Sequence, residues 1–325
     1  MDIKKPKTCL LTVTNQCILK CRMCHLWKLD TAKDELSIED CKRFIDSLNG
    51  FSTEPMEVHL IGGESLIKRG ILDLVRHIRS KGSRAVMTSS GYTIDEAMAE
   101  NIIDSDLSML NLSLGSLNPS IHDFLRNRDG CFQRVMNAIG YLSRDRRNSM
   151  KLGINSIISS VNLGDIIRLT KWVQQNNDLD SIYFMAVMRP FGSGLDWDWF
   201  EKEDCKDLWP SDYSKVEKVI DKLIDLKKDG HKIENPIGQL QSFKAYFKDP
   251  NHFIKSNRCN VSDQAINVNA IGDVYSCFFM DKLGNIKKDN IKDLWYSEKA
   301  NEVRKKMYAC RQNCELVVNC YYENE

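Results

Sequence analysis

Short apolar runs alternate with helical patterns along the first two-thirds of this 325-residue chain, and this rhythm limits its fold more than any other feature. The runs at 8–13, 58–61, 85–88, 109–114, 152–158 and 182–188 predict six strands. Apolar periodicity predicts helices between them, at 37–48, 71–79, 132–142 and 163–174. Strands joined by helical crossovers pair in parallel, so the expected class is α/β.

Six strand–helix units do not fill an eight-stranded barrel. A partial (β/α)6 TIM-like barrel with an open side and a doubly wound sheet both fit the pattern. After residue 190 the rhythm changes, with a helix expected at 213–228, a hairpin at 265–277 turning at Gly272-Asp273, and a helix at 291–308. We therefore expect a core domain at 1–195, a linker and helical segment closing the barrel at 196–257, and a small β-hairpin/helix domain at 258–325.

Charge and cysteine usage narrow the functional classes. A formal net charge of +1 argues against nucleic acid as a partner. The first apolar run is too short for a signal-peptide core or a membrane span, so we expect a cytoplasmic protein with no membrane partner. A reducing compartment does not preserve disulfides, and the twelve cysteines then indicate metal or redox chemistry.

Three cysteines follow the first predicted strand with the spacing C-x3-C-x2-C: Cys17, Cys21 and Cys24. A structural zinc site needs four ligands, and His25, adjacent to the third cysteine, is poorly placed as the fourth. Three thiolates on a four-iron cluster leave one iron open for a cofactor. A zinc or redox site stays as the alternative.

The run from Asn15 to Cys24 resembles the signature loop of the radical S-adenosylmethionine (SAM) superfamily, although Met23 stands where the family usually has an aromatic residue. The resemblance implies a partial barrel and a 4Fe–4S cluster whose open iron binds SAM. It also implies reductive cleavage of SAM to a 5′-deoxyadenosyl radical, which abstracts a substrate hydrogen.

Further motifs at successive strand ends resemble those with which the family binds SAM. Gly62-Gly63-Glu64 resembles its Gly-Gly-Glu motif, and Arg126, in a His-Asp-x-x-Arg stretch, would hold the SAM carboxylate. Gly115 stands where the family has an aspartate. The cofactor-binding residues that the resemblance implies are Gly62, Gly63, Glu64, Ser89, Ser113, Arg126 and Asn155. A surface salt bridge for Arg126 and a core amide for Asn155 are the plain alternatives.

The last fifth of the chain holds five more cysteines: Cys259, Cys277, Cys310, Cys314 and Cys320. With the Gly272–Cys277 stretch, they resemble the SPASM or twitch extension that binds auxiliary iron–sulfur clusters. Five cysteines suit one auxiliary 4Fe–4S cluster, with Cys320 as the fifth claimant beside the other four. A zinc site that staples the C-terminus is the alternative.

An auxiliary cluster can accept an electron from a substrate radical or relay electrons. The chain begins almost at its first strand, which favours oxidation of a small molecule over maturation of a ribosomally made peptide by cross-linking or epimerisation. The candidate thiol hydrogen donors are Cys131 and Cys205. A low-potential donor such as flavodoxin or ferredoxin is the expected protein partner. A non-enzymatic zinc or iron–sulfur redox sensor is the alternative from another class.

Overall fold

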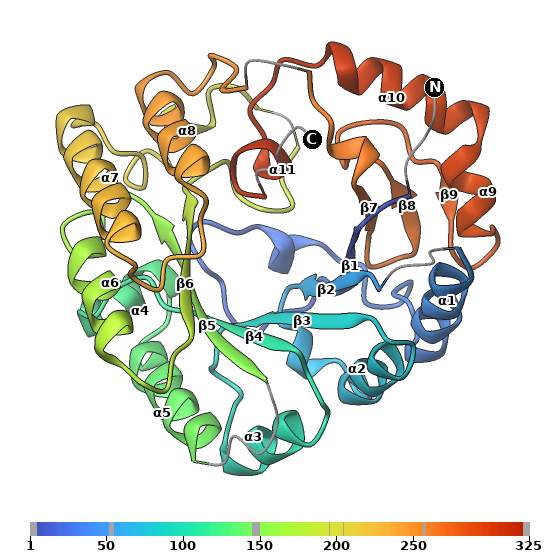
Figure 1. Ribbon diagram of the computed structural model, residues 1–325, viewed down its shortest axis with the longest axis horizontal. Coiled ribbons are helices and arrows are strands. Elements are labelled where there is room, and N and C mark those ends of the chain that lie inside the picture. The colour runs from blue at the N-terminus through green and yellow to red at the C-terminus, as the bar shows by residue number, and fades with distance from the viewer. Residues whose placement is uncertain are drawn as a thin grey trace.

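The computed structural model describes residues 5–51, 55–144, 150–194, 196–203, 205–255 and 258–320. Six strands pair in parallel in chain order, and they curve around the centre of the molecule in Figure 1. Their bounds are β1 Thr8–Thr14, β2 Glu57–Gly62, β3 Arg84–Ser89, β4 Met109–Ser113, β5 Lys151–Ile158 and β6 Ser181–Ala186. The expected partial (β/α)6 barrel is confirmed.

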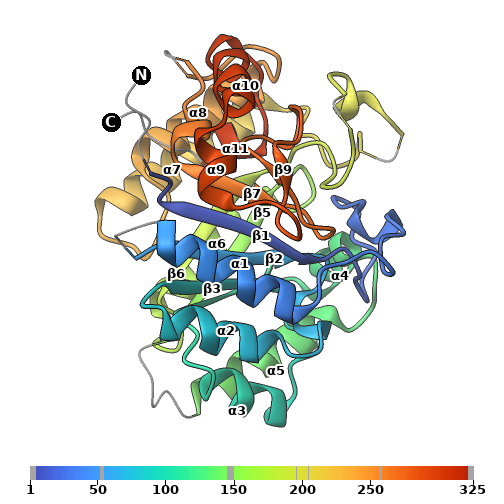
Figure 2. The same cartoon turned by 90° about the vertical axis from the view of Figure 1, so that its right-hand side faces the viewer.

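Helices cover the outer face of these strands (Figures 1 and 2). Their bounds are α1 Ile38–Phe51, α2 Ile71–Ser80, α3 Glu96–Ile103, α4 Pro119–Arg126, α5 Cys131–Ser143 and α6 Ile166–Gln175. The sequence patterns gave α1, α2, α5 and α6 but missed α3 and α4, which have only eight residues each. Both short helices begin at capping side chains, Asp95 and Asn118, which accept backbone N–H bonds in the first turn.

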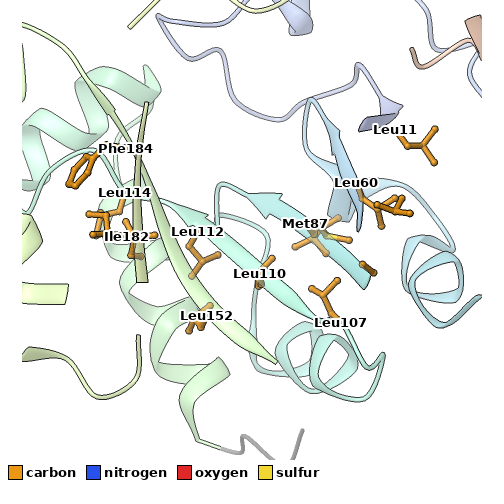
Figure 3. Packing of buried hydrophobic residues seen from close by; sticks show 14 of the residues in the cluster. Leu11, Leu60, Met87, Leu107, Leu110, Leu112, Leu114, Leu152, Ile182 and Phe184 are labelled. Atoms are coloured by element: carbon orange, nitrogen blue, oxygen red, sulfur yellow. The ribbon is translucent and has the colours of Figure 1, made fainter. Parts of the chain in front are cut away.

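The main hydrophobic core lies between the strands and this helical layer. Leu11, Leu60 and Met87 from neighbouring strands are fully buried, and Leu110 and Leu152 continue the same layer (Figure 3). Each apolar side chain of this size stabilises the fold by about 1.5–3 kcal/mol when buried. The opposite strand face lines the barrel and is more polar, because Thr88, Asn111 and Asn155 alternate with the core residues.

The C-terminal hairpin extends the sheet on the far side of β1. Strand β7 (Ala265–Val268) pairs in parallel with β1, and β8 (Asp273–Tyr275) and β9 (Gly284–Asn285) follow in antiparallel pairs, giving nine strands in the order β6-β5-β4-β3-β2-β1-β7-β8-β9. Gly272 precedes β8 with a φ of 92°, a left-handed conformation that suits glycine at a hairpin turn. The expected hairpin is thus present.

The open side of the barrel is covered by α7 (Tyr213–Lys228), α8 (Ile237–Lys248) and α11 (Glu315–Val318) (Figure 1). Asn319, just after α11, exchanges two hydrogen bonds with the backbone of Ala186 at the edge of β6 (2.8 and 3.0 Å). Asn235 does the same for Phe184 (2.7 and 2.9 Å). The edge of β6 is therefore covered by these side-chain amides and by a short parallel backbone bridge between Ile182 and Ile233.

One helix expected at 291–308 is in fact two, α9 (Ile291–Tyr296) and α10 (Glu298–Ala309). Ser297 separates them because its backbone is extended, with a ψ of 155°, and its side chain accepts a bond from Ala300 N. This serine is an N-cap, which helical periodicity alone does not reveal. The division into domains at residues 195 and 257 stays a prediction.

No helix in the described ranges is long and apolar enough to cross a membrane.

The tryptophans of the 196–257 segment mostly pack together. The ring centres of Trp199 and Trp209 lie 5.6 Å apart, and those of Trp209 and Tyr246 lie 5.5 Å apart. Trp197 is exposed.

Candidate active site

The cysteine loop begins directly after β1 and is held by backbone contacts on both sides. Arg22 N donates to Leu125 O in α4 (3.1 Å), and His25 N donates to Phe191 O, after β6 (2.7 Å). The Trp27 indole donates to Cys24 O (2.8 Å). The loop therefore lies at the carboxyl ends of the parallel strands, where barrel active sites are assembled.

The three loop thiols lie close together, since the charge of Cys21 acts on Cys17 and the charges of Cys17 and Cys21 act on Cys24. All three are partly exposed. Burial, reinforced by the neighbouring cysteines, raises the pKa of Cys17 to about 11 and that of Cys24 to about 12. These two thiols are thus protonated at neutral pH in the metal-free chain, and metal binding must displace their protons.

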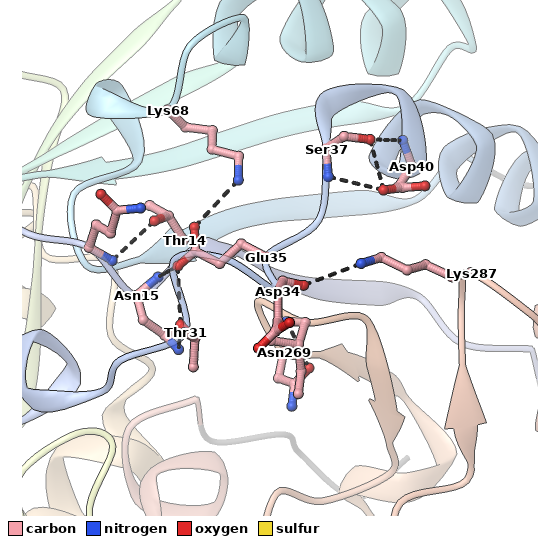
Figure 4. A network of polar contacts seen from close by, with 12 residues as sticks. Thr14, Asn15, Thr31, Asp34, Glu35, Ser37, Asp40, Lys68, Asn269 and Lys287 are labelled. Atoms are coloured by element: carbon pink, nitrogen blue, oxygen red, sulfur yellow. Dashed lines mark hydrogen bonds and ion pairs between the residues drawn. The ribbon is translucent and has the colours of Figure 1, made fainter.

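The segment after the loop is fixed by the buried carboxylate of Glu35 (Figure 4). Its Oε1 accepts bonds from Asn15 N (2.8 Å) and the Thr31 hydroxyl (3.2 Å), and its Oε2 pairs with Lys68 Nζ (3.4 Å). Lys287, after β9, donates to Asp34 O (3.2 Å). The loop is therefore attached to β2 on one side and to the C-terminal hairpin on the other.

The glycine pair after β2 permits close contact with the cysteine loop. A Cβ on Gly62 would stand 2.1 Å from Thr14 O, and one on Gly63 would stand 2.1 Å from Gln16 O. Gly63 N and Glu64 N donate to these same two carbonyls (2.8 and 2.9 Å). Larger side chains at either position would push the loop away from β2.

Glu64 is buried beside this contact and its carboxylate faces the end of β3. Its Oε2 accepts bonds from Ser90 N (3.0 Å) and from the Ser90 hydroxyl (2.6 Å). Ser89, the serine expected to bind the cofactor, instead uses its hydroxyl to accept a bond from Gly91 N (3.0 Å). Ser90 is thus a site residue that the sequence motif did not single out, because only the fold brings it to Glu64.

Arg126 ends α4 next to the cysteine loop, with Nη1 3.8 Å from Cys21 Sγ. Within the described ranges it has no carboxylate partner, and its buried Nε has no hydrogen-bond partner. Asp123, the neighbour considered for a salt bridge, instead accepts bonds from Gly130 N and Phe132 N, both at 2.7 Å. The guanidinium is therefore free to bind an anion beside the thiols.

Two further candidates lie at the ends of neighbouring strands. Asn155 on β5 donates weakly to Thr88 (3.5 Å), and its buried Oδ1 has no partner. Ser113 is the last residue of β4, in register with Asn155. Three thiols, an anion-binding arginine and unpartnered polar atoms at adjacent strand ends suit an iron–sulfur cluster with SAM on its open iron. The individual ligand assignments stay predictions.

Four of the five C-terminal cysteines come together from separate elements. Cys259 precedes the short helix η4 (Val261–Asp263), Cys277 follows β8, Cys310 ends α10, and Cys314 begins α11. Electrostatic coupling joins Cys277 to Cys259 and Cys310, and Cys314 to Cys277. Burial raises the pKa of Cys277 to about 12. Four converging thiols match the ligand set of a four-iron cluster.

Cys320 stands apart from these four. Among the described residues, its thiol has charge interactions with Glu315 and with Tyr183 on β6 but with no other cysteine. The geometry favours Cys259, Cys277, Cys310 and Cys314 as the ligand set.

An ion pair links the end of β6 to this second site. Arg189 is buried, with Nη2 2.8 Å from Glu315 Oε2, and its guanidinium lies 3.9 Å from the centre of the Phe279 ring. Burial raises the pKa of the Glu315 carboxyl, and the charge of Arg189 opposes that rise. Sequence periodicity could not pair residues so far apart in the chain.

The two proposed thiol hydrogen donors are both buried. Cys131 begins α5 and Cys205 follows η3 (Trp199–Glu201), and each is 2% exposed. Their role stays a prediction.

In the described part of the chain, no three Cys, His, Asp or Glu side chains meet at a point where one metal ion would fit.

Comparison with known proteins shows which family models match this chain and which solved structures share its fold. Residues 11–172 match the radical SAM superfamily model, and residues 259–321 match SPASM, an iron–sulfur cluster-binding domain. The AdoMet-dependent heme synthase of Methanosarcina barkeri is 22% identical over 315 residues, covering 92% of this chain and 84% of that protein. The Fe-coproporphyrin III synthase of the same organism matches over 50% of this chain and 39% of its own length. The AdoMet-dependent heme synthase of Nitratidesulfovibrio vulgaris matches over 56% of this chain and 49% of its own length.

Two solved structures share the fold. Streptococcus suis SuiB bound to S-adenosylmethionine superposes with a TM-score of 0.67 at 17% identity, covering 92% of this chain and 66% of that one. The enzyme anSMEcpe with bound AdoMet and Cp18Cys peptide gives 0.65 at 19% identity, covering 97% and 88%. The two family models coincide with the two cysteine sites. The cofactors that these two domains imply are a SAM-binding 4Fe–4S cluster, auxiliary iron–sulfur clusters and SAM. The chain therefore belongs to the radical SAM enzymes with a C-terminal SPASM domain.

Proposed function

We propose that this chain reductively cleaves SAM and uses the resulting radical to abstract hydrogen from its substrate. The proposal rests mainly on the position of Arg126. This cation lies beside the three-thiol loop and has no carboxylate partner in the described ranges. A 4Fe–4S cluster held by Cys17, Cys21 and Cys24 would supply one electron to the sulfonium of bound SAM, so that its S–C5′ bond would break into methionine and a 5′-deoxyadenosyl radical.

The residues of the chain position SAM and keep water out. The Arg126 guanidinium binds the SAM carboxylate through charge-assisted hydrogen bonds. The strand end at Gly62 and Gly63, with the carboxylate of Glu64, provides acceptors for the SAM amino group. Asn155 offers its unpartnered Oδ1 to the ribose. Leu19 and Met23, buried at 1% and 6% exposure, form the dry side of the loop.

The C-terminal thiols hold the auxiliary 4Fe–4S cluster, which we assign to electron transfer. Buried ligands suit a redox centre that exchanges electrons with the substrate or with the first cluster. A low-potential protein donor, flavodoxin or ferredoxin, supplies the electron.

We further infer a cytoplasmic location, since none of the twelve cysteines is in a disulfide.

Two substrate classes receive similar support. Oxidation of a small molecule suits an auxiliary cluster as electron acceptor. A peptide substrate is the second candidate, because the similar enzyme anSMEcpe was solved with a peptide. Small-molecule pools and candidate precursor peptides are each added to the SAM-loaded enzyme, and the class that raises 5′-deoxyadenosine formation identifies the substrate.

The proposal is tested by measuring 5′-deoxyadenosine in anaerobically reconstituted enzyme with SAM and dithionite. We expect cleavage by the wild type, and SAM affinity at least about tenfold lower in Arg126→Ala, because a charge-assisted hydrogen bond contributes about 1.5–3 kcal/mol. Arg76→Ala, on the exposed face of α2, is the control and leaves affinity unchanged. Absence of cleavage in the wild type, with both clusters loaded, would overturn the proposal.

A further inference from the structure

Five exposed cations surround the cysteine loop without carboxylate partners in the described ranges: Lys20, Arg22, Lys28, Arg128 and Arg134. We call them the cationic rim. The loop segment 17–29 contributes three of them and no acid, and the helical segment 124–134 contributes the others with Asp129 as its only acid. The rim is therefore a positive surface patch.

Contacts within the rim connect it directly to the loop. Arg128 Nη1 donates to Ile18 O (3.0 Å), and Arg22 Nε donates to Phe124 O (3.1 Å). The Arg22 guanidinium lies 4.0 Å from the centre of the Phe124 ring, which is itself exposed. Cations and exposed aromatic rings so close to the thiols form a surface that can bind an acidic partner.

Aromatic rings hold the other cations in place. Lys20 Nζ and Lys28 Nζ each lie 5.4 Å from the Trp27 ring centre, and Arg128 and Arg134 lie 4.4 and 5.5 Å from that of Tyr92. Because rings and not carboxylates orient these side chains, their positive charge is not neutralised. Arg128 lies in the turn between α4 and α5, and Arg134 lies in the first turn of α5.

The surface near the C-terminal thiols differs in this respect. Arg258 pairs with Asp263 (3.7 Å), Lys282 with Asp273 (3.4 Å), and Lys306 with Asp281 (3.0 Å). Lys305 and Arg311 are exceptions within five residues of Cys310: neither has a carboxylate partner among the described residues, and the Arg311 guanidinium bonds to backbone carbonyls and lies near the Phe253 ring. Three of the C-terminal thiols are also more buried than the loop thiols.

We propose that an acidic, low-potential electron-donor protein docks on the cationic rim and delivers its electron at the Cys17–Cys24 loop, not at the auxiliary site. This inference rests on the proposed function, since it names the surface that the donor uses. One electron passes from the reduced donor to the oxidised cluster, and no bond in the protein changes. Docking here is favoured because opposite charge raises the association rate and the thiols lie at the surface.

The test measures 5′-deoxyadenosine formation driven by a reduced acidic flavodoxin. The rim variant is Lys20→Glu/Lys28→Glu/Arg134→Glu, none of which is placed in SAM binding. The matched control is Lys215→Glu/Lys218→Glu/Lys222→Glu, three exposed lysines on α7. A third variant, Lys305→Glu/Arg311→Glu, reverses charge beside the auxiliary thiols.

We expect the flavodoxin concentration for half-maximal rate to rise at least about tenfold in the rim variant at low salt, and to remain unchanged in the other two. Added salt should weaken flavodoxin binding by the wild type. Dithionite-driven cleavage and iron content should match the wild type in all three. Unchanged flavodoxin dependence in the rim variant, or a larger rise in the Lys305/Arg311 variant, would overturn the docking site.

Two further measurements keep the outcomes separate. Wild-type cleavage with dithionite decides the proposed function alone, whatever flavodoxin does, and its absence would remove both proposals. If the rim variant loses iron, the neutral Lys20→Gln/Lys28→Gln/Arg134→Gln variant replaces it. Direct binding of flavodoxin to the wild type that is insensitive to salt would also contradict docking on the rim.

Discussion

The two cysteine sites differ in how the chain holds their thiols. Cys17, Cys21 and Cys24 lie in one short loop after β1 and are all partly exposed. The C-terminal set comes from four separate segments, and Cys259, Cys277 and Cys314 lie in a second hydrophobic cluster with residues such as Val303 and Met307. One site is local and open, and the other is long-range and enclosed.

This difference matches two kinds of chemistry. An open site leaves room for SAM on the cluster and for a donor at the surface. An enclosed site shields its cluster from solvent and ties its formation to the folding of the whole C-terminal region. The loop site should therefore be removable without unfolding the chain, whereas the second site should respond to changes in distant contacts.

Removing the loop thiols should have the largest effect on activity. We expect Cys17→Ala/Cys21→Ala/Cys24→Ala to abolish 5′-deoxyadenosine formation, because no ligands remain for the SAM-binding cluster. Iron should fall from about eight to about four per chain, since the auxiliary cluster remains. Cys41→Ala, on α1 and outside both sites, should keep all the iron. Loss of all iron from the triple variant would contradict two independent sites.

Breaking the ion pair beside the second site should cost the most stability. Arg189→Met leaves the Glu315 carboxylate, whose side chain is 16% exposed, without its partner, which should lower the free energy of unfolding by up to about 3–5 kcal/mol. Arg144→Met breaks an exposed pair with Glu96 and should cost less than about 1 kcal/mol. Urea unfolding of the metal-free variants measures both. Equal small losses would show that the Arg189 contact does not fix the second site.

The first site has a pH-sensitive support in His122. Burial, with the nearby charge of Arg126, lowers the pKa of His122 from 6.5 to about 3, and its Nδ1 accepts a bond from Gly115 N (3.2 Å). As pH falls below 6.5 the unfolded chain binds this proton before the folded chain does, so stability is lost on the acid side.

Between pH 7.5 and 4.5 the wild type should therefore lose roughly 3 kcal/mol more than His122→Asn, which carries no titrating group there. Urea unfolding of the metal-free proteins at the two pH values gives this difference. Parallel losses in both proteins would mean that His122 is not held neutral in the fold.

The smallest expected effect concerns the fifth C-terminal cysteine. Cys320→Ala should leave iron content and the spectrum of the auxiliary cluster unchanged, because Cys320 couples to Glu315 and Tyr183 instead of the other thiols. Cys310→Ala is the matched variant and should perturb that cluster. An auxiliary spectrum altered in Cys320→Ala would place this cysteine among the ligands.

Local patterns predicted the open site and its scaffold well. The strand runs and the C-x3-C-x2-C spacing are short-range signals, so they identified β1 to β6 and the cysteine loop. The motif residues Gly62, Gly63 and Arg126 do stand beside the loop. Ser90 was missed because its contact with Glu64 depends on how β2 and β3 lie side by side.

The enclosed site was less predictable because its contacts are long-range. The sequence favoured four of the five cysteines and kept Cys320 as a fifth claimant, but nothing local indicates that Arg189 meets Glu315. The pairing of β7 with β1 likewise joins opposite ends of the chain. The break at Ser297 was missed although the buried face changes there, from Ile291 and Trp295 in α9 to Ala300, Val303 and Met307 in α10.

The most direct test of two iron–sulfur sites is a count of iron, sulfide and zinc per chain after anaerobic purification and reconstitution. About eight irons with matching sulfide are expected, as two four-iron clusters require. About four irons would leave one site empty, and the cysteine variants would identify it. Bound zinc that iron does not displace, with no sulfide, would contradict the account.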